Sequence, residues 1–295
     1  MKIGVTFPTA ALGNDPAAIR DFAQAIEGAG FDHLRAAEHV IGGHPDRLRG
    51  ERVHTYDVPY HEPFVLFGYL GAITQRLELV TSILILPQRQ TALVAKQAAE
   101  LDLLTGGRLR LGVGVGRNWM EYEALNEDFH TRGRRIAEQV AVLRRLWTEE
   151  LVTFDGRWHH LDRMGLNPMP VQRPIPLWMG SYTTVVERVI ERIARLADGW
   201  FPQFPPNDEF RAVLERFRGY AAQAGRDPAS IGIDVGIDVG INAARGGPQD
   251  WAAQQKAWQE LGATHLTVGT MGSSFTSPRQ HIDAMVRCKQ VLDGG

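Results

Sequence analysis

The stretch Leu111–Asn118, LGVGVGRN, places three glycines at alternate positions and decides how the rest of the chain is interpreted. A dinucleotide-binding loop of the G-x-G-x-x-G type needs a small residue at its sixth position. Counted from Gly112, the sixth position is Arg117, and counted from Gly114 it is Trp119. The stretch therefore does not match that loop, and the alternation of a β-strand accounts for it better.

Successive side chains of a strand point to opposite faces of its sheet. From Leu109 to Val115 every odd position holds Leu or Val, whereas Arg110 and the glycines occupy the even positions. If the branched face packs against helices, the glycine face points inward and leaves space for a large, flat ligand. The other interpretation is that the glycines only permit strong strand curvature. The polar Arg117 and Asn118, which follow at once, favour a ligand site.

Short apolar runs alternate with longer amphipathic segments along the whole chain. The expected strands are Ile3–Phe7, His33–Ala36, Leu77–Leu84, Arg110–Val115, Ile175–Met179, Gly199–Phe201, Ile231–Ile241 and His265–Val268. The expected helices are Ala17–Ala29, Pro63–Thr74, Ala92–Leu104, Arg134–Glu149, Val185–Leu196, Asp208–Ala224, Gln249–Leu261 and Ser277–Leu292. Eight strand-then-helix units predict an α/β fold, a (β/α)8 TIM barrel. An open, doubly wound parallel sheet is the alternative.

We expect one domain, residues 1–295, with insertions after strands 2 and 4 and before strand 5. The first insertion, Ala37–Glu62, is rich in His, Gly, Pro and Tyr, and the second is Trp119–Asn126. In the third, Leu151–Pro174, the segment VTFDGRWHHL predicts a hairpin that turns at Asp155-Gly156. Long insertions in a barrel commonly build or cover the active site.

The composition is that of an ordinary globular protein, with 44% hydrophobic residues, 22% charged residues and a formal net charge of −2. Without a basic excess, we expect no nucleic-acid partner. The lone Cys288 excludes an internal disulfide and suits a reducing compartment. No secretory segment or membrane-length apolar run is present, so we expect a cytoplasmic protein without a membrane partner. No histidines have paired zinc-ligand spacing, so we expect no metal.

Several segments resemble, in their order and spacing, the bacterial luciferase-like flavin and deazaflavin oxidoreductases. They are GFDHLRAAEHV, RLELVTSILILP, KQAAELDLLTGGRLRLGVGVGRNWMEYEALN, VTFDGRWHHLDRMGLNPMPVQRPIPLWMGS and ARLADGWFP. The resemblance is strong over residues 1–202 and weak beyond them. It implies a (β/α)8 barrel, in agreement with the strand count, and a homodimer formed through first-half helices such as Pro63–Thr74 and Ala92–Leu104.

Catalytic groups of TIM barrels lie where the strands end, and the second strand ends in Glu38-His39. A histidine passes protons near neutral pH, and an adjacent carboxylate can tune or orient it. The resemblance places both side chains close to the reactive face of a cofactor ring. The alternative interpretation is that His39 only satisfies a hydrogen bond of the core.

The resemblance also implies cofactor-binding residues at the ends of two further strands. The Ser82-Ile83 bond matches a bulge that supports the back of the ring and often contains a non-proline cis peptide in relatives. Gly116, Arg117 and Asn118 should approach the ribityl chain and the ring edge. Relatives carry an acidic residue at the position of Arg117. We therefore expect neither a general acid at this position nor a sugar-phosphate substrate.

After the fifth strand, polar residues open the expected helix. These are Gly180, Ser181, Tyr182, Thr183 and Thr184. Free N–H groups and hydroxyls at a helix N-terminus bind phosphate, and the helix dipole adds to this attraction. Simple N-capping by Ser181 or Thr183 is the other interpretation, but relatives bind the cofactor phosphate here.

We expect an oxidoreductase that uses coenzyme F420 for hydride transfer to or from a small organic substrate, with His39 and Glu38 handling the proton. One alternative is an FMN-dependent monooxygenase that uses O2, and another is a non-catalytic flavin-binding protein. Both cofactors share the ring and the first phosphate. Beyond it, the deazaflavin carries an acidic lactyl-glutamate tail, for which Arg47, Arg49 and Arg52 are candidate ligands.

Overall fold

Eight parallel strands close into a barrel in the computed structural model, which describes residues 1–47, 54–182, 186–236 and 241–294. In order around the barrel they are β1 (Lys2–Thr6), β2 (His33–Ala36), β3 (Glu78–Thr81), β5 (Leu109–Gly114), β8 (Leu177–Gly180), β9 (Gly199–Phe201), β10 (Gly232–Val235) and β12 (His265–Gly269). Because β12 pairs with β1, the sheet has closed on itself. The TIM-barrel prediction is confirmed, and the open-sheet alternative is wrong.

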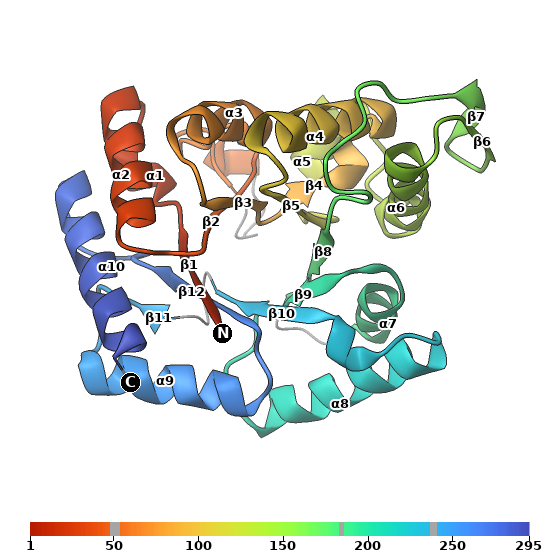
Figure 1. Ribbon diagram of the computed structural model, residues 1–295. Coiled ribbons are helices and arrows are strands. Elements are labelled where there is room, and N and C mark those ends of the chain that lie inside the picture. The colour runs from red at the N-terminus through yellow and green to blue at the C-terminus, as the bar shows by residue number, and fades with distance from the viewer. Residues whose placement is uncertain (48–53, 183–185, 237–240, 295) are drawn as a thin grey trace.

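Helices surround this barrel (Figure 1). They are α2 (Pro16–Gly28), α3 (Pro63–Ile73), α4 (Thr91–Thr105), α6 (Arg132–Thr148), α7 (Glu187–Leu196), α8 (Asp208–Gln223), α9 (Pro248–Glu260) and α10 (Pro278–Asp293). Each lies within a few residues of its prediction. Along the described ranges, no helix is both long enough and apolar enough to cross a bilayer. On α3 and α4, Val65 and Leu104 are exposed, and the homodimer through these helices stays a prediction.

Shorter elements interrupt the alternation of strand and helix. They are α1 (Thr9–Leu12), α5 (Trp119–Ala124), β4 (Leu84–Ile85), β11 (Ile241–Asn242) and 3-10 turns at Pro45–Arg47, Leu86–Gln88 and Pro228–Ser230. The predicted strand Leu77–Leu84 is therefore divided into β3 and β4. The predicted strand Ile231–Ile241 is likewise represented by β10 and β11, and residues 237–240 lie outside the described residues.

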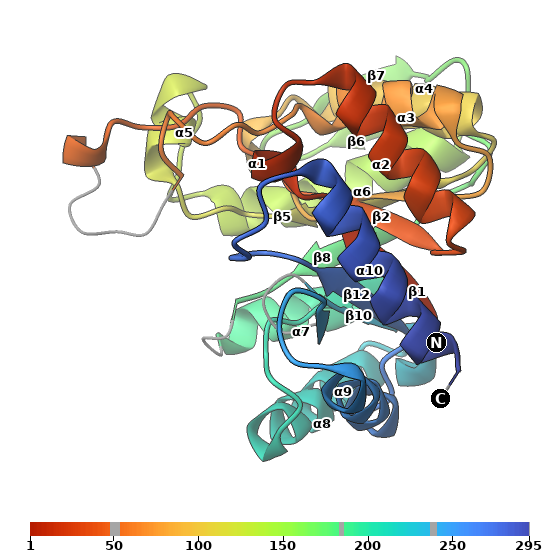
Figure 2. The ribbon, with the colours of Figure 1, turned by 90° about the vertical axis from the view of Figure 1, so that its left-hand side faces the viewer.

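The insertion after β2 and helix α5 project from one end of the barrel, whereas both chain termini lie at the other end (Figure 2). The predicted hairpin is confirmed as β6 (Val152–Asp155) paired antiparallel with β7 (His160–Met164). Its turn is bound from outside by Glu138 of α6, whose carboxylate accepts the backbone N–H groups of residues 157–159. The hairpin therefore packs on a helix and does not wall the barrel mouth.

The alternation predicted for β5 is present in the structure. Leu109, Leu111 and Val113 are buried in the core that faces the helices, whereas Arg110 points into the barrel and reaches Asp234 and Glu78. This arrangement turns the glycine face of β5 inward, as the sequence predicted.

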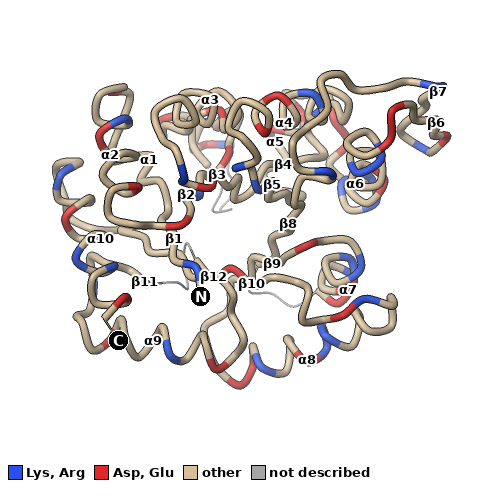
Figure 3. The backbone as a smooth tube through the Cα atoms, viewed as in Figure 1, with Lys and Arg blue, Asp and Glu red and all other residues tan. Residues whose placement is uncertain are grey.

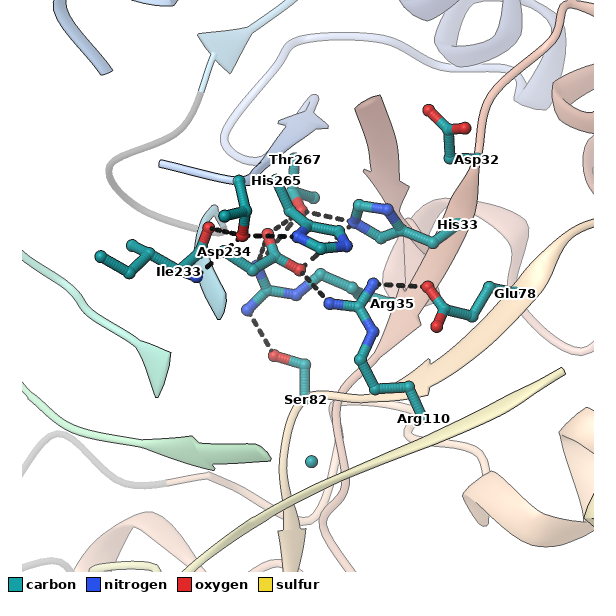
Figure 4. Close-up of polar contacts among 12 residues, drawn as sticks. Asp32, His33, Arg35, Glu78, Ser82, Arg110, Ile233, Asp234, His265 and Thr267 are labelled. Atoms are coloured by element: carbon teal, nitrogen blue, oxygen red, sulfur yellow. Dashed lines mark hydrogen bonds and ion pairs between the residues drawn. The ribbon is translucent and has the colours of Figure 1, made fainter. Parts of the chain in front are cut away.

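Charged side chains fill the barrel interior and converge on Asp234 of β10 (Figure 4). Its carboxylate lies 3.1 Å from Nη1 of Arg35 and 3.1 Å from Nη1 of Arg110, and Thr267 donates its hydroxyl to it at 2.9 Å. All four side chains are almost fully buried. Burial acts to raise the pKa of Asp234, but Arg35 and His33 outweigh it and hold that pKa well below its usual range. Asp234 is therefore the anion that balances two buried arginines.

Replacing Asp234 by Asn should destabilise the fold by about 3–5 kcal/mol, because it leaves two buried guanidinium groups without their shared carboxylate. Urea unfolding at pH 7 measures the loss, and the exposed Glu150→Gln variant serves as the control with no expected change. The stabilisation by Asp234 is fully present above its unfolded pKa of about 3.9 and is lost as the pH falls through the lower folded pKa. A constant difference between wild type and variant down to strong acid would contradict this assignment.

Candidate active site

Two adjoining cavities open at the end of the barrel where the strands finish. Their volumes are about 430 Å³ and 160 Å³, and the larger falls within the ~300–1,000 Å³ range of small-molecule pockets. Both are lined by Ser82, Ile83, Gly116, Arg117, Tyr182 and Gln203. We call the joined space the cleft. It brings together residues that the sequence predicted at the ends of strands 2, 3, 4 and 5.

A bulge between β3 and β4 forms the floor of the cleft. The Ser82-Ile83 peptide is cis, as the matching bond often is in relatives. A Cβ atom placed on Gly114 would lie 2.6 Å from Cδ1 of Ile83, and one placed on Gly180 would lie 3.1 Å from its Cγ2. Phe201 similarly fills the space above Gly112. The glycine face of β5 therefore admits Ile83 and Phe201, while Gly114 and Gly116 also line the larger cavity.

His39 lies in the smaller cavity with its ring held by a carboxylate from another element. Its Nδ1 is 3.1 Å from Oε1 of Glu121, on α5, and the same oxygen accepts the N–H of Val40 at 3.0 Å. Glu121 is fully buried, whereas the His39 side chain is 25% exposed. Since a carboxylate only accepts hydrogen bonds, the proton of a neutral His39 resides on Nδ1, and Nε2 is the nitrogen left for a ligand.

Glu38 has a different role from the one predicted. Its carboxylate accepts the N–H of Ile85 at 2.6 Å and forms a buried ion pair with Arg89. Arg89 also pairs with Glu62 at 2.8 Å, at the start of α3. Burial raises the pKa of Glu38, against the opposing effect of Arg89. The expectation that Glu38 orients His39 is wrong, because the Glu38 carboxylate is bound by Ile85 and Arg89, whereas Glu121 bonds the ring of His39. Glu38 instead joins the first insertion to the β4 segment.

Two aromatic residues of the first insertion enclose His39. The ring of His54 stacks on it with centroids 4.6 Å apart and an interplanar angle of 20°, and Tyr60 meets both rings edge-on. Burial and the neighbouring His39 lower the pKa of His54, so His54 is neutral at pH 7. Burial raises the pKa of Tyr60. These two neutral side chains restrict the imidazole of His39 to one orientation.

The segment after β5 supplies polar groups to the cleft. Gly116 has φ of 58°, a conformation that favours glycine, and Arg117 lies over the Tyr182 ring at 5.2 Å. Asn118 caps α5 by accepting the N–H of Met120. Its Nδ2 is buried and has no hydrogen-bond partner among the described atoms. Asn118 therefore brings an unused donor to the smaller cavity.

The segment after β8 differs from its prediction. The N–H of Ser181 donates to the Phe201 carbonyl at 3.2 Å, and its hydroxyl accepts the Trp200 indole N–H at 2.9 Å. Helix α7 begins only at Glu187, and its N-cap residue Val186 makes no side-chain cap. The expectation that Ser181 opens or caps the helix is wrong, because Ser181 continues the pairing with β9. Gly180 and Tyr182 line the cleft, whereas Thr183 and Thr184 lie outside the described residues.

Sequence reasoning did not find Glu121, His54 or Tyr60 as site residues. Glu121 is three residues after the N-cap Asn118, where an acidic residue is ordinarily explained by helix capping. Among the described residues, no three His, Cys, Asp or Glu side chains are placed together so that they could hold a metal ion.

A closed (β/α)8 barrel with a cleft at its strand ends, containing a histidine held by a buried carboxylate, defines a TIM-barrel enzyme. The chain belongs to the luciferase-like monooxygenase family, whose profile matches residues 1–283. It is thus an oxidoreductase or monooxygenase of a family with both F420-dependent and FMN-dependent members.

Two curated relatives are named for these two cofactors. An F420-dependent glucose-6-phosphate dehydrogenase of Gordonia bronchialis is 30% identical over 65% of this chain and 54% of its own length. An FMNH2-dependent dimethylsulfone monooxygenase of Pseudomonas fluorescens is 28% identical over 73% of this chain and 56% of its own length. The chain thus spans about half of each. The coenzyme F420-dependent tetrahydromethanopterin reductase of Methanopyrus kandleri shares the fold, with a TM-score of 0.78, 14% identity, and coverage of 99% of this chain and 98% of that one.

Replacing Glu121 by Leu should release His39 from its Nδ1–H tautomer, because no other described carboxylate bonds its ring. Long-range ¹H–¹⁵N NMR of His39 in the purified protein should then show a larger Nε2–H population than in wild type. The Glu123→Leu variant, on the exposed side of α5, should leave the His39 signals unchanged. Identical His39 spectra in wild type and Glu121→Leu would contradict the role given to Glu121.

Proposed function

We propose that this protein is an F420-dependent oxidoreductase that transfers a hydride to or from a small organic substrate in the cleft. The observation that carries the proposal is the His39–Glu121 pair, in which buried Glu121 holds the ring of His39 and His39 lines the cleft beside the Ser82-Ile83 bulge. A hydride transfer between an alcohol and a carbonyl needs a partner that moves a proton at the oxygen, and a histidine near neutral pKa suits that task. The similarity to an F420-dependent relative supports the same choice.

The cleft residues fit a flavin-type ring with a phosphate-bearing side chain. Ile83 offers an apolar surface behind the ring, and the unused Nδ2 of Asn118 would donate to an oxygen at its edge. Arg117 and the Ser181 hydroxyl lie along the larger cavity, where they would hold the phosphate. A buried donor without a partner is costly unless a ligand satisfies it, so Asn118 supports a polar ligand here.

The bound deazaflavin would supply a ring carbon that accepts or gives up a hydride. The protein supplies orientation and proton handling. Glu121 keeps the proton of neutral His39 on Nδ1 and stabilises the imidazolium when Nε2 also takes a proton. His54 and Tyr60, stacked and edge-on against His39, keep Nε2 directed while the substrate oxygen gains or loses its proton.

FMN with O2 is the second candidate, and the similarity to an FMNH2-dependent relative favours it. The lining of the smaller cavity supports the deazaflavin instead. Beside the apolar Ile83 and Ile85, it contains a set of polar side chains, namely Glu38, His39, His54, Arg117, Asn118, Tyr182 and Gln203. Such a lining suits proton exchange with a substrate oxygen better than the water-free surroundings that oxygen chemistry on a reduced flavin requires.

Purified protein titrated separately with oxidised F420 and oxidised FMN should bind F420 more tightly. Absorbance and fluorescence changes of the two chromophores measure both dissociation constants under one buffer condition. Tight binding of FMN with none of F420 would replace the proposal by the monooxygenase alternative.

Replacing His39 by Ala should lower turnover with F420 by about 10²- to 10⁴-fold, the usual contribution of a positioned acid–base group. Cofactor affinity should stay nearly unchanged, because His39 is assigned to the substrate proton. The exposed His44→Ala variant, in the same insertion, is the matched control. Undiminished turnover in His39→Ala would show that the proton is handled elsewhere, and a wild-type protein that binds cofactor without turnover on any substrate would favour the non-catalytic alternative.

A further inference from the structure

Three arginines gather between α6 and α7, next to the larger cavity. Arg132 is the first residue of α6, and Arg188 and Arg192 lie one turn apart on α7. Nη1 of Arg192 donates to the carbonyl of Gly133 at 2.8 Å, which brings α7 against the start of α6. The two helices pack side by side, and Figure 3 shows basic residues on both. Arg192 also lines the larger cavity, so this arginine cluster adjoins the cleft.

The arginine cluster has no acidic partner among the described residues. Other arginines of the same two helices are paired, Arg144 with Asp198 at 2.7 Å and Arg195 with Glu191 at 3.5 Å. In contrast, Arg132 and Arg192 donate only to backbone carbonyls. Burial first, and then Arg188, lower the pKa of both Arg132 and Arg192. Three neighbouring cations without an anion repel one another, and such a cluster is typical of an anion-binding surface.

The start of α6 adds a second, independent observation. Its first turn contains no acidic residue, and its N-cap Thr131 makes no side-chain cap. Arg132, Arg134 and Arg135 stand in this turn instead. Cations at a helix N-terminus are unfavourable, because the helix dipole is positive there. An anion bound at this point would satisfy the dipole and the arginine cluster together.

We propose that Arg132, Arg188 and Arg192 bind the carboxylates of the acidic chain that extends the phosphate of the deazaflavin. The inference rests on the proposed function, which puts the ring and phosphate of that cofactor in the cleft. Arg192 belongs both to the cleft and to the arginine cluster, so a chain that leaves the phosphate reaches the cluster directly.

Arg47, one of the three arginines expected for this tail from sequence, is about half exposed and pairs with Glu123 at 2.7 Å, so its charge is already matched. Arg49 and Arg52 lie outside the described residues. Within the described residues, the arginine cluster is the group proposed to distinguish a cofactor with an acidic tail from FMN, which ends at its phosphate.

The test compares two deazaflavins that differ only beyond the phosphate. One is F420 with its lactyl-glutamate tail, and the other is the deazaflavin 5′-phosphate, which ends at its phosphate. Wild-type protein should bind the tailed form about tenfold more tightly at low ionic strength, the size expected for charge-assisted hydrogen bonds. This difference should shrink as salt screens the partly exposed charges.

In the double variant Arg132→Gln/Arg188→Gln most of the tenfold difference between the two deazaflavins should be lost, and the tail-free form should bind as it does to wild type. Arg192 is left intact because it contacts Gly133 and the cleft. The Arg195→Gln variant, on α7 but paired with Glu191, should retain the tenfold difference. Melting temperatures establish that both variants are folded.

Equal affinity of wild type for the two deazaflavins would overturn the arginine-cluster assignment while leaving the proposed cofactor in place. If the double variant loses affinity for both deazaflavins equally, the arginine-cluster assignment is also overturned, because such a loss indicates a structural effect. If neither deazaflavin binds and FMN or FAD binds instead, the proposed function itself is overturned. A preference for FAD over FMN that the double variant abolishes would assign the cluster to a second phosphate and overturn the carboxylate assignment.

Discussion

The ion pairs that Asp234 forms inside the barrel are the interaction on which the rest of the site depends. Two guanidinium groups could not remain in this interior without a compensating anion, because the cost of desolvating charges is several kcal/mol per ion. With Asp234 in place, Arg35 has a fixed position, and its Nη2 donates to Oγ of Ser82 at 2.6 Å. The buried charges therefore extend from the centre of the barrel to the floor of the cleft.

From that floor, packing fixes the remaining parts of the site. Ser82 is held by Arg35, and Ile83 occupies the room that Gly114 and Gly180 provide. His39 approaches from the end of the neighbouring strand β2 and receives its orientation from Glu121. A site whose support comes from strands and a fully buried carboxylate is preorganised, so little reorganisation is needed when a ligand enters. The first insertion contributes His54 and Tyr60 as a wall around this fixed centre.

The fold was predictable from sequence because strand alternation and helix periodicity are local properties, and β5 is the clearest case. The partners of the site residues were not predictable, since they depend on contacts between distant segments. Glu121 is 82 residues from His39, and Arg89 is 51 residues from Glu38. Adjacency in sequence suggested Glu38 as the partner of His39, whereas the distant residues Arg89 and Glu121 hold the two side chains separately. Ser181 was likewise expected at the start of a helix, because local sequence does not show that the Trp200 indole N–H donates to its hydroxyl.

The residues proposed to act at the ring of the cofactor are different from the residues proposed to select the cofactor. A flavin and a deazaflavin present nearly the same surface to Ile83, Gly114 and Asn118, so these residues have little basis for discriminating between them. Discrimination requires a group that meets the two molecules where they differ, which is beyond the phosphate. Among the described residues, the arginine cluster next to Arg192 carries positive charge without an acidic partner, and it adjoins the cleft at the end proposed for the phosphate. On the proposed assignment, the choice of cofactor depends on arginines of α6 and α7, and the proton-handling centre at His39 is independent of it.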